Sequence, residues 1–406
     1  MTRAGLLALL LAMSPGAGVA QGGALPTLAD LGLGWRSAGG GFQLDLSGRL
    51  DVEGYLPQDR PQWVIPETDA FVAGRLRLFA DLFVGDALYG LLEIRSDRGE
   101  APDDAPLEVR VEQAFARVAL PLPAGLQLQA GKFASPIGGY PARHHTPEDP
   151  LIRPPVMYDY HTIVDPASAP GATAGFLDWK DDPVRRPAGT PIVWGVPYPW
   201  GALVAGAAGT FDFRFGVTSA APSSRPEMWD LDGDRLERPS LVAAAGWRVV
   251  PELRVEAYFS RGSYLDDLRQ GALPAGAELE EFFQELWGAE LVFARGPATV
   301  RVEAFANRWN VPNVGDDVRD RSYSIEAKAK LAAGLFAAAR YGAIHFNELG
   351  AAGAREPWDH DIRRLQLGAG YRLLRNTELR AEYLISRTDG ADPRDDLLSL
   401  QWWWEF

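Results

Sequence analysis

The last ten residues of the chain alternate between apolar and polar side chains. From Leu398 to Phe406, every second residue is leucine, tryptophan or phenylalanine, and most of the residues between them are polar. An extended strand sends successive side chains to opposite faces, so the pattern predicts a strand with one apolar face. On an exposed edge of a soluble β-sandwich, three tryptophans and a phenylalanine would invite aggregation. A membrane barrel places such rings against lipid and leaves no free edge, so this segment favours a closing barrel strand.

The same period of two recurs along the chain and predicts sixteen strands. They lie at about 41–53, 70–84, 86–97, 109–120, 124–133, 200–208, 210–218, 240–249, 251–261, 286–295, 297–307, 322–332, 334–345, 361–373, 376–388 and 397–406. Short turns, such as Gly85-Asp86, alternate with long loops rich in Pro and Asp. This alternation predicts an all-β fold, a closed antiparallel transmembrane β-barrel with short periplasmic turns and long extracellular loops. In the strand at 109–120 the alternation changes parity, which predicts a bulge.

The amino-terminal residues have the features of a secretory signal peptide. Arg3 precedes an apolar run, and Gly18-Val19-Ala20 is a small-x-small cleavage signature. We expect residues 1–20 to be removed, residues 21–40 to form a periplasmic segment and residues 41–406 to form the barrel. The expected location is the outer membrane of a Gram-negative-type bacterium, with its lipid bilayer as a partner.

Charge and composition narrow the function further. The chain of 406 residues has no cysteine, so no disulfide framework holds it together, and its net charge of −14 argues against a nucleic-acid partner. Many charged residues lie on the polar faces of the predicted strands, where burial in a dry core would be costly. Sixteen strands leave room for water inside, so we predict a water-filled lumen.

Basic side chains on the lumen face and in the longest loop are the candidate site residues. Arginine in a pore favours anions because its guanidinium group stays charged and binds carboxylate or phosphate through two parallel hydrogen bonds. For most of these side chains taken singly, the simpler interpretation is a salt bridge that only keeps the wall polar. The predicted pore-lining and constriction residues are Arg75, Arg77, Arg95, Lys132, Arg143, Arg153, Arg214, Arg254, Arg301, Lys328, Arg340 and Arg380.

The connection at 134–199 is the third long loop and has about 65 residues, far more than an ordinary loop. Its proline, aromatic and aliphatic residues are able to pack, which argues against disorder. We expect it to fold into the lumen as a constriction loop, and to bring Arg143 and Arg153 near Arg75, Arg77 and Arg95.

A motif at the start of this loop is similar to one in a known family. The stretch GKFASPIG, from Gly131 to Gly138, resembles the G-[KQ]-F-x-x-P-[FI]-G segment of the phosphate-selective porin O/P group of sixteen-stranded porins. The strand count, the long third loop and the terminal Phe406 extend the resemblance over nearly the whole mature chain. It implies homotrimers, an inward-folded third loop, and lumenal Arg and Lys that conduct anions. This chain has only four lysines, so the resemblance supports a porin more than a phosphate site.

The resulting prediction is a porin for passive diffusion of small hydrophilic solutes, with a weak preference for anions such as phosphate. It has no catalytic residue, no cofactor and no metal. A non-conducting structural barrel is the first alternative. A metal site is a second, with candidate ligands His144, His145, Glu148, Asp149 and His161 in no fixed spacing. A third is a membrane-embedded hydrolase that pairs Ser386 with His345 or His360, although the G-x-S-x-G motif is missing.

Overall fold

The computed structural model describes most of the predicted barrel. The described residues are 33–58, 64–65, 69–98, 106–122, 125–144, 148–182, 185–231, 237–267, 269–351, 353–391 and 395–406. The predicted signal peptide at 1–20 and the first part of the predicted periplasmic segment, 21–32, lie outside these residues.

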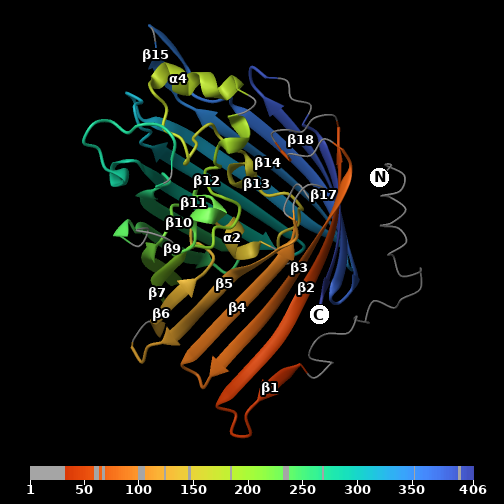
Figure 1. The fold of residues 1–406 in the computed structure, drawn as a ribbon. Coiled ribbons are helices and arrows are strands. Elements are labelled where there is room, and N and C mark those ends of the chain that lie inside the picture. The colour runs from red at the N-terminus through yellow and green to blue at the C-terminus, as the bar shows by residue number, and fades with distance from the viewer. Residues whose placement is uncertain are drawn as a thin grey trace.

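Sixteen antiparallel strands form a closed barrel, which confirms the predicted fold (Figure 1). Neighbouring barrel strands pair in chain order, and the ring closes where β19 pairs with β2, from Leu397 opposite Pro57 to Glu405 opposite Arg49. In a closed barrel the backbone N–H and C=O groups of every strand are hydrogen-bonded on both sides, which is required because lipid offers them no partners. The barrel strands are β2 (Phe42–Pro57), β3 (Phe71–Val84), β4 (Leu88–Asp97), β5 (Glu108–Ala119), β6 (Gln127–Lys132), β7 (Trp200–Ala208), β8 (Phe211–Thr218), β9 (Ser240–Val250), β10 (Leu253–Ser263), β11 (Phe283–Arg295), β12 (Ala298–Trp309), β13 (Val318–Ala332), β14 (Leu335–Phe346), β17 (Ile362–Leu374), β18 (Thr377–Thr388) and β19 (Leu397–Glu405).

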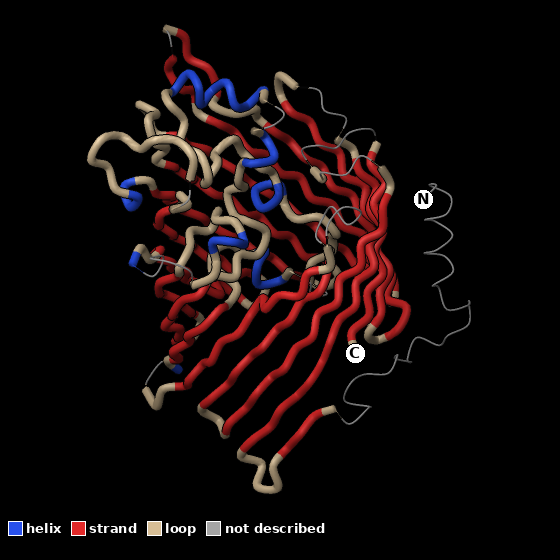
Figure 2. The backbone as a smooth tube through the Cα atoms, viewed as in Figure 1, coloured by secondary structure: helices blue, strands red, loops and turns tan. Residues whose placement is uncertain are grey.

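The two rims of the barrel differ (Figure 2). One rim carries tight turns, and the loops and short helices gather toward the other. At the tight-turn rim, β1 (Gly34–Arg36) pairs with the start of β2. A hairpin of β15 (Glu348–Ala351) and β16 (Ala354–Pro357) stands on a long loop, where the hydrophobic pattern did not predict strands.

The strands expose apolar side chains on their outer face and turn polar ones inward. In β8, for example, Phe211, Phe213 and Phe215 are exposed, whereas Asp212 and Arg214 alternate with them and line an internal cavity. The predicted bulge is present in β5, where the register against β4 shifts between Glu93 and Ile94. None of the described helices is long and apolar enough to cross a membrane.

The third long loop, between β6 and β7, lies inside the barrel, as predicted. It contains α2 (Tyr140–Arg143), α3 (Val156–Asp159), α4 (Thr173–Leu177), and the short 3-10 turns η2 (Asp178–Asp181) and η3 (Arg186–Ala188). Its apolar side chains form a core with inward residues of the wall, including Leu286 and Phe305. Gly342 on β14 leaves the space that Val156 fills, since a Cβ there would lie 2.9 Å from the valine side chain. The loop is therefore packed in place rather than suspended in the lumen.

Candidate functional site

Four arginines stand side by side on the inner face of β2 to β5. Arg49 is opposite Arg77, Arg77 is opposite Arg95, and Arg95 is opposite Arg110. Directly opposed residues on neighbouring strands have Cβ atoms about 4.5–5.5 Å apart, and like charges at that distance repel. We call these four residues the arginine row.

Buried carboxylates beside the row hold its guanidinium groups in place. Asp51 lies 2.8 Å from Arg49, and Glu112 lies 3.0 Å from Arg110. Asp97 is shared, because Arg75, Arg95 and Arg110 all lie within ion-pair distance of it. These pairs offset the repulsion within the row and fix the direction of its side chains.

The row connects two internal cavities. One of them, which we call the upper cavity, has a volume of about 820 Å³ and is lined by Arg75, Arg77, Arg95 and Arg110. Among the described acids that pair with these arginines, only Glu112 lines this cavity. The other, which we call the lower cavity, has a volume of about 480 Å³ and is lined by Arg77 and Arg49. Strands in a barrel are tilted by about 35–45° from its axis, so a row that crosses the strands also descends along the wall. The arginine row therefore follows the path from one cavity to the other.

Arg77, His144 and Tyr198 line both cavities and mark the constriction between them. His144, which follows α2, contacts the hydroxyl group of Tyr140 through Nδ1 at 2.7 Å. Burial lowers the pKa of His144 well below its ordinary value, and the nearby arginines, Arg77 foremost, lower it further. The imidazole is therefore neutral. The constriction has a cationic wall side and an uncharged loop side.

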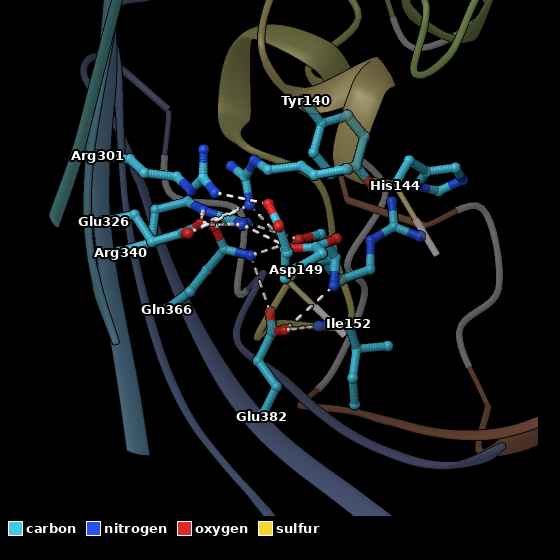
Figure 3. A network of polar contacts seen from close by, with 12 residues as sticks. Tyr140, His144, Asp149, Ile152, Arg301, Glu326, Arg340, Gln366 and Glu382 are labelled. Carbon is cyan, nitrogen blue, oxygen red and sulfur yellow. Dashed lines mark hydrogen bonds and ion pairs between the residues drawn. The ribbon is translucent and has the colours of Figure 1, made fainter. Parts of the chain in front are cut away.

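A buried ion-pair network anchors the loop to the opposite wall (Figure 3). Glu326 on β13 accepts hydrogen bonds from Arg143 at 3.2 Å and from Nε of Arg340 at 2.8 Å. Asp149 accepts from the same two arginines, at 3.1 and 3.2 Å. Two cations and two anions thus share a site from which water is largely excluded; Arg340 is only 1% exposed. Such a set is stable only while its charges balance.

Further polar contacts hold the loop backbone on either side of this network. Glu382 on β18 accepts hydrogen bonds from the backbone N–H groups of Ile152 and Arg153. Glu303 on β12 accepts from the backbone N–H of Gly139 at 2.7 Å and from the hydroxyl group of Tyr158 at 2.6 Å. The wall therefore determines where the loop lies, and with it the position of His144.

The predicted site residues separate into several groups. Arg75, Arg77 and Arg95 line the upper cavity. A third cavity, of about 1130 Å³, lies beyond the loop near the tight turns, and it is lined by Arg143, Arg214, Arg254, Arg301 and Lys328. Most of these cations pair with wall acids, as Arg254 does with Asp212 at 2.6 Å.

Other predicted residues lie elsewhere. Lys132 points to Asp230 in the loop after β8, at 2.7 Å. Arg153, Arg380 and Arg75 line a small cavity together. Arg380 also forms an ion pair with Glu378 at 2.6 Å. The loop thus brings Arg153 to Arg75, as expected. It does not bring Arg143 there, because the guanidinium group of Arg143 turns to Glu326 and Asp149.

The prediction of pore-lining residues omitted Arg49 and Arg110 of the arginine row, and His144 and Tyr198 of the constriction. Arg49 follows Ser47 on the polar face of its strand, so parity alone would have placed it inside. Arg110 precedes the bulge, which obscures its parity. His144 lies in the predicted constriction loop, but the sequence gives no reason to select it among the residues of that loop. Tyr198 has no local signal, since its position depends on how the long loop folds.

The alternative chemistries gain little from the structure. Among the described residues, no group of three His, Asp or Glu side chains is placed to hold a metal ion; His145 lies outside the described residues. Ser386 is buried on the inner face of β18, whereas His345 is exposed on the outer face of β14 and pairs with Asp361. His360 contacts Asp181 at 3.1 Å.

Comparison with known proteins gives a likeness of fold. No family model matches this chain, and no curated protein matches it. Among solved structures, an anion-selective porin from Comamonas acidovorans superposes with a TM-score of 0.59 at 11% identity, over 90% of this chain and 100% of that one. OmpF of Salmonella typhi, in a complex with daunomycin, has a TM-score of 0.58 at 11% identity, over 90% and 98% of the two chains. The trimer form of OmpT, an outer membrane protein of Vibrio cholerae, has a TM-score of 0.56 at 14% identity, over 90% and 99%. The chain therefore has the fold of bacterial outer-membrane porins.

Proposed function

We propose that this protein is an outer-membrane porin, a water-filled channel for passive diffusion of small hydrophilic solutes with a preference for anions. The observation that carries the proposal is the arginine row, because four like charges in register lie along the passage between two cavities. A barrel with only a structural role has no use for four opposed cations, since their repulsion has to be offset by buried carboxylates. A channel does gain, since the row offers a permeating anion a continuous series of cationic contacts.

The overall negative charge of the chain does not oppose this preference. Exposed charges are screened over about 8 Å at physiological ionic strength, so acids in the outer loops act weakly on a solute inside the lumen. A solute that passes the constriction would come close to Arg77, which lines both cavities. The neutral imidazole of His144 adds no charge on the other side.

The nature of the anion is proposed only as a class. Guanidinium groups bind carboxylate and phosphate alike, and only four lysines are available for a site of the phosphate-selective kind. Lys328 lines the third cavity, away from the arginine row. We therefore assign small anions in general, without a dedicated phosphate site.

Export and assembly are part of the proposal. Residues 1–20 would be removed as a signal peptide, and the mature amino terminus would be Gln21, which mass spectrometry of the purified protein would show. The Vibrio cholerae structure of the same fold has a trimer form, so we propose a homotrimer here too. Mass measurement in detergent tests this.

The experiment that tests the proposed function compares ion selectivity in planar bilayers. The variant Arg77→Gln with Arg95→Gln removes two central charges of the row. Its matched control is Arg214→Gln with Arg254→Gln, which removes two lumen arginines from the third cavity. The proposal expects the reversal potential in a salt gradient to move toward cation selectivity in the first variant and much less in the control. Equal shifts in both variants, or none in either, would contradict it.

A further inference from the structure

The upper cavity has a second wall, formed by the third long loop, that differs from the arginine wall. Aromatic and proline side chains gather there, among them Tyr140, Tyr158, His161, Trp194 and Tyr198, and Trp229 from the loop after β8 packs against Tyr198. In the described part of the loop, five charged residues also line this cavity, namely Asp159, Lys180, Asp181, Asp182 and Arg186. Four of them pair with residues outside the lining: Asp159 with Arg153, Lys180 with Glu356, Asp181 with His360 and Arg186 with Asp359. One cavity therefore combines a row of arginines on the barrel wall with aromatic rings on the loop wall.

Several of these rings serve the core of the loop, but two are available to a solute. Tyr140 and Tyr158 are almost fully buried, and their rings pack against each other. Trp194 and His161 are different, because each keeps part of its surface open while their ring centroids lie 5.1 Å apart. The two rings are tilted by 48° to each other, so this pair gives the loop side of the cavity an aromatic corner that a ring could enter.

Tyr198 connects this surface to the constriction. Its ring packs against Trp229 with centroids 5.9 Å apart, and it lines the lower cavity too. Burial raises the pKa of Tyr198 well above its ordinary value, and Glu93 and Glu112 raise it further, so the phenol stays neutral. The aromatic wall thus continues, without charge, down to the point where Arg77 faces the passage.

We propose that this cavity is a binding site for small aromatic carboxylates, and that the channel admits them in preference to small anions without a ring. The inference rests on the proposed porin function and names its substrate class. The carboxylate would contact the arginine row, where the planar guanidinium groups match it with two parallel hydrogen bonds. The ring would lie against Trp194 and His161, gaining an aromatic contact and removing apolar surface from water.

The cavity fits this class in size and character. A volume of about 820 Å³ lies within the usual range of small-molecule sites, about 300–1,000 Å³, and such sites combine apolar walls with a few placed polar groups. A chloride ion or acetate would use only the arginine wall. A neutral aromatic molecule would use only the loop wall, and an aromatic cation would be repelled by the row.

The test measures how four probes reduce the chloride current of the full-length channel in planar bilayers. Benzoate carries both ring and charge, acetate only the charge, benzyl alcohol only the ring, and benzylamine the opposite charge. We expect benzoate to reduce the current with an apparent affinity at least about fivefold higher than the other three, the amount expected from one aromatic contact. Equal effects of benzoate and acetate would overturn the inference and leave the porin function standing. A protein that conducts no chloride would overturn both.

Substitutions locate the effect. Trp194→Leu should lower the apparent benzoate affinity about fivefold and leave that of acetate unchanged, and Trp194→Phe, which keeps a ring, should restore most of it. Trp35→Leu is the matched control, because Trp35 is exposed on β1 and does not line the cavity. Chloride conductance reports whether each variant folds. A Trp194→Leu channel that conducts normally and still prefers benzoate would contradict the proposed site.

Discussion

The anchor of the third long loop offers a sharp test, through the substitution Glu326→Gln. This change removes one of the two carboxylates that pair with both Arg143 and Arg340, so the buried network loses a balancing negative charge. Removing one partner of a buried ion pair costs about 3–5 kcal/mol. Glutamine keeps one carbonyl acceptor, so we take the lower value, about 3 kcal/mol. That energy shifts the equilibrium between docked and undocked loop about 150-fold toward undocking.

The expected result is a change in conduction without a change in the barrel. Strand pairing does not depend on Glu326, so circular dichroism should show the same strand content. Single-channel recordings should show larger or noisier conductance steps, because the segment around His144 leaves the constriction for part of the time. Glu256→Gln is the matched control, since Glu256 faces the lumen and pairs with Arg214 and Arg254 rather than with the loop.

A double variant checks the charge argument. Adding Arg340→Gln to Glu326→Gln leaves Arg143 paired with Asp149 and restores neutrality, so the conductance steps should become quieter than in the single variant. If the single variant records like the unmodified protein, the ion-pair network does not hold the loop and the reasoning is wrong.

Three further predictions concern the loop and the seam of the barrel. Gly138→Ala should undock the loop and raise the conductance, because Gly138 has a φ of +86° and a Cβ there would collide with the hydroxyl group of Tyr158. The left-handed backbone alone costs alanine about 1–2 kcal/mol. Unchanged conductance steps would argue against this prediction. Gly48→Leu should lower the thermal stability of the folded barrel, because the ring of Phe406 occupies the space beside Gly48; an unchanged melting temperature would contradict this. Because the pKa of His144 is lowered in the docked loop, only the undocked imidazole takes up a proton. Docking of the loop should therefore weaken, and current noise should rise, as the pH falls below about 6.5. His144→Gln should remove this pH dependence of the noise.

The barrel could be predicted from the sequence because its strands obey local rules. Alternation of apolar and polar residues depends only on the strand itself, and the segment 200–208 coincides with β7. The predicted ends of the strands were less accurate where a strand continues, with polar residues, beyond the part of the barrel that faces lipid. β13 begins at Val318 rather than at 322, since Arg319 and Arg321 lie at an exposed rim where lipid tails do not select for apolar residues.

The arginine row could be predicted only in part, because register is not a local property. A three-residue turn, 85–87, joins β3 to β4, so the opposition of Arg77 and Arg95 follows from counting back from the turn. A long loop joins β2 to β3, and the sequence carries no signal that places Arg49 opposite Arg77. Arg110 was obscured by the bulge in β5.

The loop side of the site was the least predictable part. The length and composition of the loop indicated that it folds inward, and it does. Which residues it presents depends on contacts made far away in the chain, such as the one between Arg143 and Glu326. For that reason the sequence could not single out His144, one of several histidines in the loop, as the residue at the constriction.

The central claim is that the arginine row makes the channel prefer anions, and the reversal potential of the unmodified protein in a potassium chloride gradient tests it most directly. Potassium and chloride ions have nearly equal mobility in water, so any sustained potential at zero current reports the charge selectivity of the pore itself. The account predicts the sign that corresponds to a chloride permeability greater than that of potassium. A potential of the opposite sign would show that buried acids such as Asp97 and Glu112, rather than the arginines they hold, determine what passes.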